Sequence, residues 1–196
     1  MSVLSRLGLP MFRAGGPPQV SDQDWRLSVD GLVAAPLSLT LAHIAALPQS
    51  EVSARLTSVS GFSVRALWQG VLWRDFLAAI KPQAQASHAT FTSQGGGYQT
   101  TLSLETLDHP RVVLVTGVEG EPLEREYGGP LRMVIPHRWG YKSAKWLAGV
   151  TLGQGMQGGY WEDRGYTREG IIEPGYTLDV NTRTRRQIKG GEVTEF

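Results

Sequence analysis

The stretch that decides the fold is GGPLRMVIPHRWGYKSAKWL, residues 128–147. It contains the basic residues Arg132, His137, Arg138, Lys142 and Lys145 and no Asp or Glu. The whole chain is nearly neutral, with 19 Lys and Arg residues against 18 Asp and Glu residues. Positive charge is therefore concentrated in this stretch, and any anion that the protein binds is expected here.

The first half of the stretch predicts a short strand. Leu131, Met133 and Ile135 share one face by their period of two, and the pattern ends at Pro136. A glycine-containing loop follows. Such a loop can present backbone N–H groups and cationic side chains to an anionic group such as phosphate.

A solvated basic loop is the other interpretation of this stretch, and charge content alone does not decide between the two. The aromatic residues favour the anion site. Trp139, Tyr141 and Trp146 stand between the cations, and side chains of this size are seldom left exposed without a function.

Size and composition limit the remaining possibilities. A chain of 196 residues can form one domain with its own core. It has no cysteine, which excludes disulfides, thiolate metal ligands and cysteine nucleophiles. A net charge of +1 argues against nucleic-acid binding by bulk electrostatics. Residues 1–18 lack an apolar run long enough for a leader or a membrane helix, so we expect a cytoplasmic protein.

The rest of the chain shows many strand patterns and few helical ones. Strand patterns lie at residues 25–31, 37–39, 52–58, 89–93, 98–104, 112–118 and 148–152, and helical patterns at 41–47 and 73–80. Residues 112–118 are nearly all apolar, which is typical of a central strand. We expect an α+β fold with an N-terminal arm that packs little (1–24), one domain (25–172) and a C-terminal tail (173–196).

Three separated motifs resemble one protein family. The stretch at 128–147, together with WQGVLWRDFL at 68–77 and GGYWEDRGY at 158–166, is similar to the sulfite-oxidase fold of molybdopterin-dependent oxidoreductases, which includes sulfite oxidase and bacterial methionine-sulfoxide reductases. The resemblance spans about residues 25–167. It implies a strand-rich mixed-sheet domain that binds molybdopterin, the organic part of the molybdenum cofactor.

The resemblance also implies the cofactor-binding residues. Arg132 would contact the pterin phosphate or ring, and Ser143, Ala144 and Lys145 would hold the cofactor through main chain and ammonium. The weaker candidates for cofactor contact are Ser93, Tyr127, His137 and Lys142. For His137, a solvated loop histidine is the competing interpretation. Arg65 can face a substrate oxyanion or simply lie at the surface.

Ser58 stands where the family has the cysteine that binds molybdenum, and its spacing from Leu56 places it on the inward face of a strand. Three interpretations are open. Ser58 can bind the metal as serinate, a harder donor than thiolate. The metal can instead be held by the dithiolene alone. The third possibility is a pocket without molybdenum, in which Ser58 is a buried hydroxyl bonded to the backbone.

Two functions follow from this sequence. The first is a molybdopterin-binding oxidoreductase that transfers an oxygen atom or two electrons to or from a small oxidised substrate. It would exchange electrons with a separate partner and would need neither nucleic acid nor a membrane. The alternative is a family member without redox activity, which binds a pterin or another phosphate-bearing ligand or serves as an interaction module.

Overall fold

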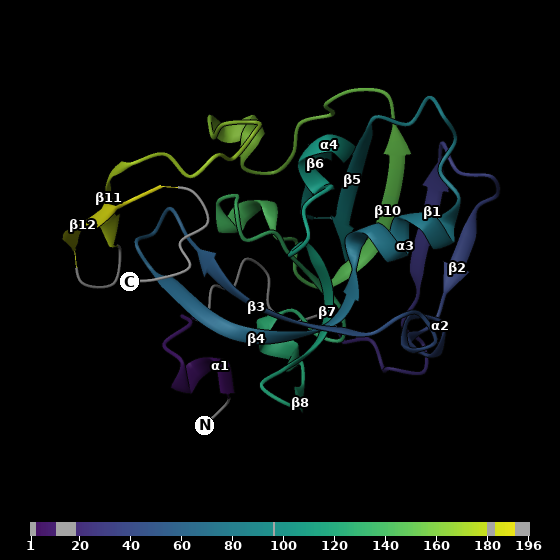
Figure 1. Cartoon of the computed structure of the whole chain (residues 1–196), viewed down its shortest axis with the longest axis horizontal. Coiled ribbons are helices and arrows are strands. Elements are labelled where there is room, and N and C mark those ends of the chain that lie inside the picture. Colours follow the sequence, from purple (N-terminus) through teal and green to yellow (C-terminus); the bar gives the residue numbers. More distant parts are fainter. Residues whose placement is uncertain (1–2, 11–18, 96, 180–182, 191–196) are drawn as a thin grey trace.

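The computed structural model describes residues 3–10, 19–95, 97–179 and 183–190. Within these residues the chain forms two five-stranded sheets and a separate two-stranded hairpin. Figure 1 shows the two sheets side by side, with the hairpin at one edge of the molecule. The predicted strand-rich α+β fold is confirmed. None of the helices in the described part of the chain is long and apolar enough to cross a membrane.

The first sheet combines strands from both ends of the domain. Its order is β2 (Leu37–Leu39), β1 (Leu27–Gly31), β10 (Leu147–Gly153), β5 (His88–Ser93) and β6 (Gln99–Ser103). Strands β1 and β10 run parallel, and the other neighbours are antiparallel. The expected helix after β2 is α2 (Leu41–Ala45), whose N-cap is Thr40.

The second sheet carries the central strand. Its order is β3 (Ser50–Thr57), β4 (Ser63–Leu72), β7 (Val113–Val118) and β8 (Glu121–Pro122), and β9 (Arg132–Val134) also pairs with β7. The register between β4 and β7 shifts at Gly70. A Cβ atom at this glycine would lie 2.0 Å from the carbonyl oxygen of Leu114, so the backbones can approach only without a side chain.

Strands β7 and β9 lie between two hydrophobic cores. Leu114 and Met133 pack into the first core with helix α3 (Trp73–Ile80), while Val115 and Val134 pack into the second core with Trp68. Because alternate side chains point to opposite faces, both faces of these strands are buried. This explains why the pattern at residues 112–118 is continuous rather than alternating.

Shorter elements complete the fold. They are helices α1 (Val3–Arg6) and α4 (Leu104–Leu107), the 3-10 turns η1 (Arg125–Tyr127), η2 (Gly140–Lys142) and η3 (Glu162–Arg164), and strands β11 (Gly175–Asp179) and β12 (Thr184–Ile188). The expectation that the N-terminal arm packs little is wrong for residues 3–9, because Leu4 and Leu9 are buried in the second core. In the C-terminal tail, β11 and β12 pair antiparallel as a hairpin. Residues 1–2, 11–18, 180–182 and 191–196 of these two segments lie outside the described residues.

Candidate functional site

Arg132 is a cation inside the protein. It lies on β9 and points into the second core, where only 3% of its surface is exposed. Its Nη1 donates to the carbonyl oxygen of Tyr127 at 2.8 Å, and its Nε donates to that of Met133 at 3.2 Å. Among the described residues, no carboxylate lies within ion-pair distance of the guanidinium. Burial lowers the pKa of Arg132 to about 10, an effect that Tyr98 partly opposes.

Lys145 lies next to Arg132 across a glycine turn. Burial, and then the charge of Arg132, lower the pKa of Lys145 to about 8. A Cβ atom at Gly128, where φ is +110°, would lie 2.9 Å from Cβ of Lys145 and 3.2 Å from Cβ of Arg132. The glycine therefore allows both cations to flank one turn. We call Arg132 and Lys145 the inner cation pair.

Three of the predicted cofactor residues hold this loop in place. Ser143 Oγ accepts a hydrogen bond from the N–H of Ile135 at 3.0 Å, and the carbonyl oxygen of Ala144 accepts one from Met133 at 2.8 Å. Ser93 Oγ donates to the carbonyl oxygen of Lys145 at 2.6 Å. The structure thus brings Ser93, Ser143 and Ala144 together beside β9, and their contact with a cofactor stays a prediction.

Tyr127 contributes its main chain to the site. Its carbonyl oxygen is the partner of Arg132, whereas its phenol is buried in the second core and donates to the carbonyl oxygen of Leu9 at 3.3 Å. The hydroxyl therefore faces the N-terminal segment rather than the inner cation pair.

Lys142 has a structural role that differs from the predicted cofactor contact. Its ammonium donates to the carbonyl oxygens of Thr101 and Arg168, each at 2.8 Å, and pairs with the carboxylate of Glu162. These three bonds use all the protons of the ammonium. Burial lowers the pKa of Lys142, and Glu162 opposes that shift. Its three partners join β6, η3 and residue 168, so the pair fastens these segments together.

Glu162 is the residue of this region that the sequence prediction missed. Its carboxylate also accepts a hydrogen bond of 2.5 Å from Thr100 Oγ1, and only 9% of the residue is exposed. The signal was present, since Glu162 belongs to the GGYWEDRGY motif, but the sequence does not reveal that its partner is Lys142.

His137 lies apart from the inner cation pair. Its ring stacks on His109 with a centroid distance of 4.3 Å, and its Nε2 is 3.0 Å from the carbonyl oxygen of Thr106. Burial lowers the pKa of His137 to about 4, with further lowering by Arg138 and His109. The imidazole is therefore neutral near pH 7 and adds no charge for an anion, and its contact with a cofactor stays a prediction.

Ser58 lies in a half-buried turn beyond β3, not on the strand face that its spacing predicted. Its Oγ accepts a hydrogen bond from the N–H of Ser60 at 3.1 Å. Gly140 packs against this turn, because a Cβ atom there would lie 3.2 Å from the carbonyl oxygen of Thr57 and 3.8 Å from Cα of Ser58. The turn and the basic loop thus meet in space.

Arg65 is exposed on the outer face of β4. It lies directly across the ladder from Arg55, while the neighbouring Val64 and Ala66 are buried. Burial lowers the pKa of Arg55, and the charge of Arg65 lowers it further. This position fits the surface interpretation of Arg65, and a substrate contact stays a prediction.

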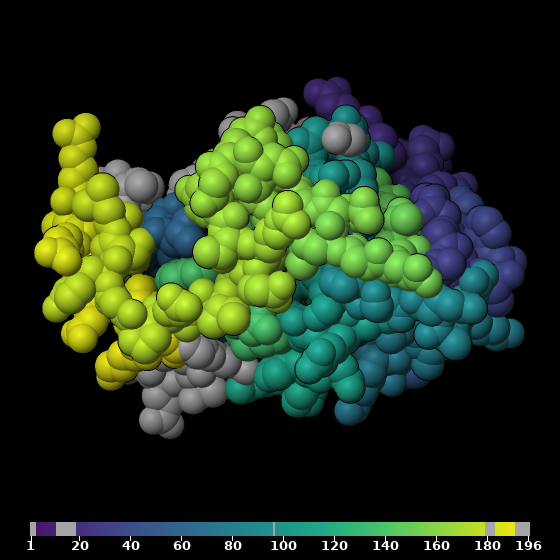
Figure 2. Space-filling model, turned by 90° about the horizontal axis from the view of Figure 1, so that it is seen from above, coloured from purple at the N-terminus to yellow at the C-terminus, as the bar shows by residue number. Residues whose placement is uncertain are grey.

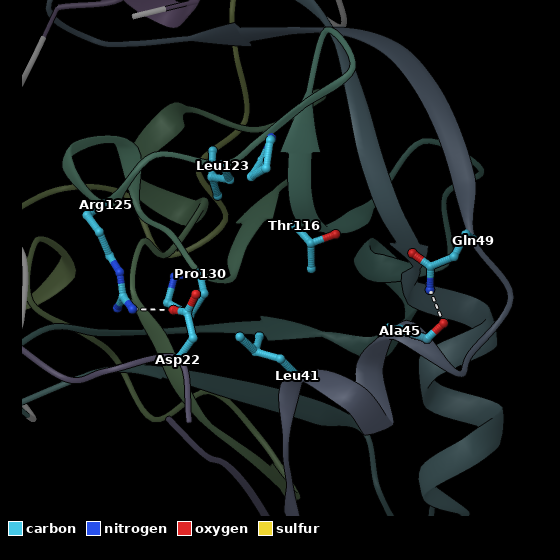
Figure 3. Close-up of a pocket in the computed structure, with 9 residues that line it drawn as sticks. Asp22, Leu41, Ala45, Gln49, Thr116, Leu123, Arg125 and Pro130 are labelled. Carbon is cyan, nitrogen blue, oxygen red and sulfur yellow. Dashed lines mark hydrogen bonds and ion pairs between the residues drawn. The ribbon is translucent and has the colours of Figure 1, made fainter. Parts of the chain in front are cut away.

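A small cavity of about 250 Å³ lies between α2 and the β7–β8 turn. Figure 3 shows that its charged side chains, Asp22 and Arg125, point toward each other, and they form an ion pair. Because these charges satisfy each other, the cavity offers little to a charged ligand.

Comparison with known proteins gives consistent matches. The family model of the oxidoreductase molybdopterin binding domain matches residues 14–161. The chain is 33% identical over 163 residues to the oxidoreductase YuiH of Bacillus subtilis, with 82% of each chain covered. It is 32% identical over 148 residues to a putative protein-methionine-sulfoxide reductase subunit of Azospira oryzae, covering 76% of this chain and 56% of that protein.

Two further proteins are matched over only about half of their length. A protein-methionine-sulfoxide reductase catalytic subunit of Xanthomonas campestris is 29% identical over 154 residues, covering 71% of this chain and 48% of that protein. The chain thus spans about half the length of the Azospira and Xanthomonas proteins. The sulfane dehydrogenase SoxCD of Paracoccus pantotrophus has a similar fold, with a TM-score of 0.68 at 19% identity, covering 90% of this chain and 47% of that chain.

Proposed function

The chain belongs to the family of oxidoreductase molybdopterin-binding domains, and from that premise we propose that it uses molybdopterin in a two-electron reaction of a small oxidised substrate. Family membership makes it a molybdopterin-binding oxidoreductase rather than a module without redox activity. The substrate, the electron partner and the roles of individual residues are the parts that we propose here.

The observation that carries the proposal is the burial of Arg132 beside Lys145. A buried guanidinium is costly unless a negative charge compensates it. Among the described residues, the partners of Arg132 are two carbonyl oxygens and the ring of Trp68, and none of them is negatively charged. A phosphate can accept charge-assisted hydrogen bonds from both members of the inner cation pair. The residues therefore fit the phosphate-bearing end of molybdopterin, with Ser93, Ser143 and Ala144 fixing the loop around it.

The proposed reaction is oxygen-atom transfer at a group such as a sulfoxide. Reduction of a sulfoxide to a sulfide consumes two electrons and two protons and releases water. When bound, the cofactor supplies the redox chemistry, and the protein supplies position and charge. The names of the Azospira and Xanthomonas relatives, both methionine-sulfoxide reductase subunits, support this substrate class.

We propose that electrons come from a separate protein. The Azospira relative is named as a subunit, and the catalytic subunit of Xanthomonas likewise implies an assembly. A location in the cytoplasm stays a prediction.

Ser58 is proposed to lie beside the metal. Its turn packs on Gly140, three residues before Ser143, so it adjoins the loop that we assign to the cofactor. A hydroxyl is a harder and less readily ionised donor than a thiol, so we expect metal to be held more weakly than by a cysteine.

The test is the metal and pterin content of the protein purified from cells that make the cofactor. Molybdenum is measured by elemental mass spectrometry and pterin by fluorescence after oxidation. We expect pterin in the unchanged protein, less pterin in Arg132→Ala, and more molybdenum in Ser58→Cys. Arg74→Ala, at an exposed position on α3, is the matched control. Absence of pterin from both the unchanged protein and Ser58→Cys would contradict the proposal.

A further inference from the structure

A cleft of about 570 Å³ adjoins the turn that carries Ser58. This volume lies within the usual range for small-molecule sites. The residues that line it come from the turn, from the loop before η2 and from the C-terminal region: Val59, Trp139, Thr167, Glu169, Ile171, Glu173, Pro174, Gly175, Tyr176, Thr177 and Ile188. Figure 2 shows the hollow between the yellow hairpin and the yellow-green segment near residue 165, with blue atoms of the β3–β4 region at its bottom.

Both walls of the cleft are fixed to the domain. Thr177 Oγ1 donates to the carbonyl oxygen of Val59, and Arg186 Nη1 donates to that of Gly61 at 3.2 Å, so the hairpin is fastened to the Ser58 turn. On the other side, the N–H of Trp139 donates to the carbonyl oxygen of Gly170 at 2.7 Å. Hydrogen bonds therefore hold both sides of the cleft in place next to Ser58.

The charge of the cleft is opposite to that of the inner cation pair. Glu169 and Glu173 are the charged residues that line it, and no Lys or Arg lines it among the described residues. Trp139 and Tyr176 add aromatic surface. Carboxylates beside aromatic rings are the surroundings that an alkylammonium group prefers, because both the ring face and the carboxylate attract a cation.

We propose that this cleft binds an alkylammonium group, as the part of the substrate that extends away from the reacting atom. The proposal rests on the proposed function for its statement that the bound molecule is a substrate. In this arrangement the anionic end of the cofactor meets the inner cation pair, and the cationic end of the substrate meets the acidic cleft.

Two cations lie close to residues that line the cleft. Burial lowers the pKa of Arg138, and the Glu169 carboxylate partly opposes that shift, so part of the charge of Glu169 is compensated. The guanidinium of Arg185 lies over the ring of Tyr176 at 4.4 Å and occupies one face of that ring.

The test compares two probes by isothermal titration calorimetry on the full-length protein purified from cells that make the cofactor. The probes are choline and dimethylbutanol, the neutral compound in which carbon replaces the nitrogen. We expect choline to bind about tenfold more tightly. The double variant Glu169→Gln/Glu173→Gln should lose that preference without weaker binding of dimethylbutanol.

Glu121→Gln is the matched control, because it removes an exposed negative charge on β8, outside the cleft lining. It should keep the choline preference. Equal binding of the two probes, or a preference that survives in the double variant, would overturn the proposal. Pterin content separates this result from the proposed function: a choline preference with no pterin in either the unchanged protein or Ser58→Cys contradicts the function alone, and pterin without that preference contradicts the cleft alone.

Discussion

Lys142 and Lys145 stand three residues apart in one loop, yet their surroundings are opposite. The ammonium of Lys142 pairs with Glu162 and with two carbonyl oxygens inside the protein. Lys145 faces a second cation, Arg132, and its pKa falls to about 8. A buried cation that meets its own carboxylate holds the fold together, whereas the buried Arg132 and the half-buried Lys145, placed side by side, can together attract an anion.

The largest expected effect comes from breaking the paired region. Glu162→Gln leaves the ammonium of Lys142 buried without a compensating charge, and we expect a loss of about 3–5 kcal/mol in the free energy of unfolding. Urea denaturation followed by tryptophan fluorescence measures it. The double variant Lys142→Met/Glu162→Leu should recover most of that loss, since no charge then remains buried. An unchanged urea midpoint for Glu162→Gln would show that the pair contributes nothing to stability.

A smaller effect, on binding rather than folding, is expected at the inner cation pair. Arg132→Ala should weaken molybdopterin binding by about 1.5–3 kcal/mol, because a charge-assisted hydrogen bond is lost. Its free energy of unfolding should fall by less than that of Glu162→Gln. Pterin retained after dialysis is the measurement, with Arg74→Ala as the control. If the two variants retained equal pterin, the anion site would lie elsewhere.

The pH dependence of stability is a further test of the contrast between Lys142 and Lys145. Below about pH 8, Lys145 is protonated in both the folded and the unfolded chain. Between about 8 and its usual pKa of 10.5, the unfolded chain binds the extra proton. The free energy of unfolding of the cofactor-free protein should therefore rise with pH through this window. After allowance for solvent screening of a half-buried ammonium, the rise is on the order of 1 kcal/mol.

The measurement is the urea midpoint of the cofactor-free protein at several pH values, compared with that of Lys145→Met. Other groups, such as Lys142 and Arg132, titrate in both proteins, so the difference between the two curves isolates Lys145. Parallel curves would contradict the lowered pKa.

The smallest effect is expected at His137, which lies in the same basic stretch as both lysines. Because its imidazole is neutral near pH 7 and bonds to Thr106, His137→Gln should leave pterin retention unchanged. Pterin loss comparable to that of Arg132→Ala would place His137 in the cofactor site after all.

The fold was largely predictable from local patterns. Alternating apolar residues predicted strands β5 and β9, and helical spacing predicted α3. Both patterns reflect which face of the element is buried, and a few neighbouring residues are enough to show it. The buried position of Leu4 was not predictable, because its partners in the second core are supplied by distant strands.

The site was predictable only in part. The concentration of charge and the family motif indicated Arg132 and Lys145 together. The pairing of Lys142 with Glu162 depends on how β6 and η3 pack, and no spacing in the sequence encodes that contact. For Ser58, the alternating pattern predicted a strand that includes residue 58, whereas β3 ends at Thr57, where the chain turns.

The parallel pairing of β1 with β10 sets an order of events during synthesis. Ser28 lies beside Gly149, a partner that is translated about 120 residues later. While the ribosome is still making the middle of the chain, the β1–β2 pair and the β5–β6 pair lack β10, the strand that joins them. The first sheet closes only after residue 153 has emerged, so cofactor loading is expected only after β10 has been made.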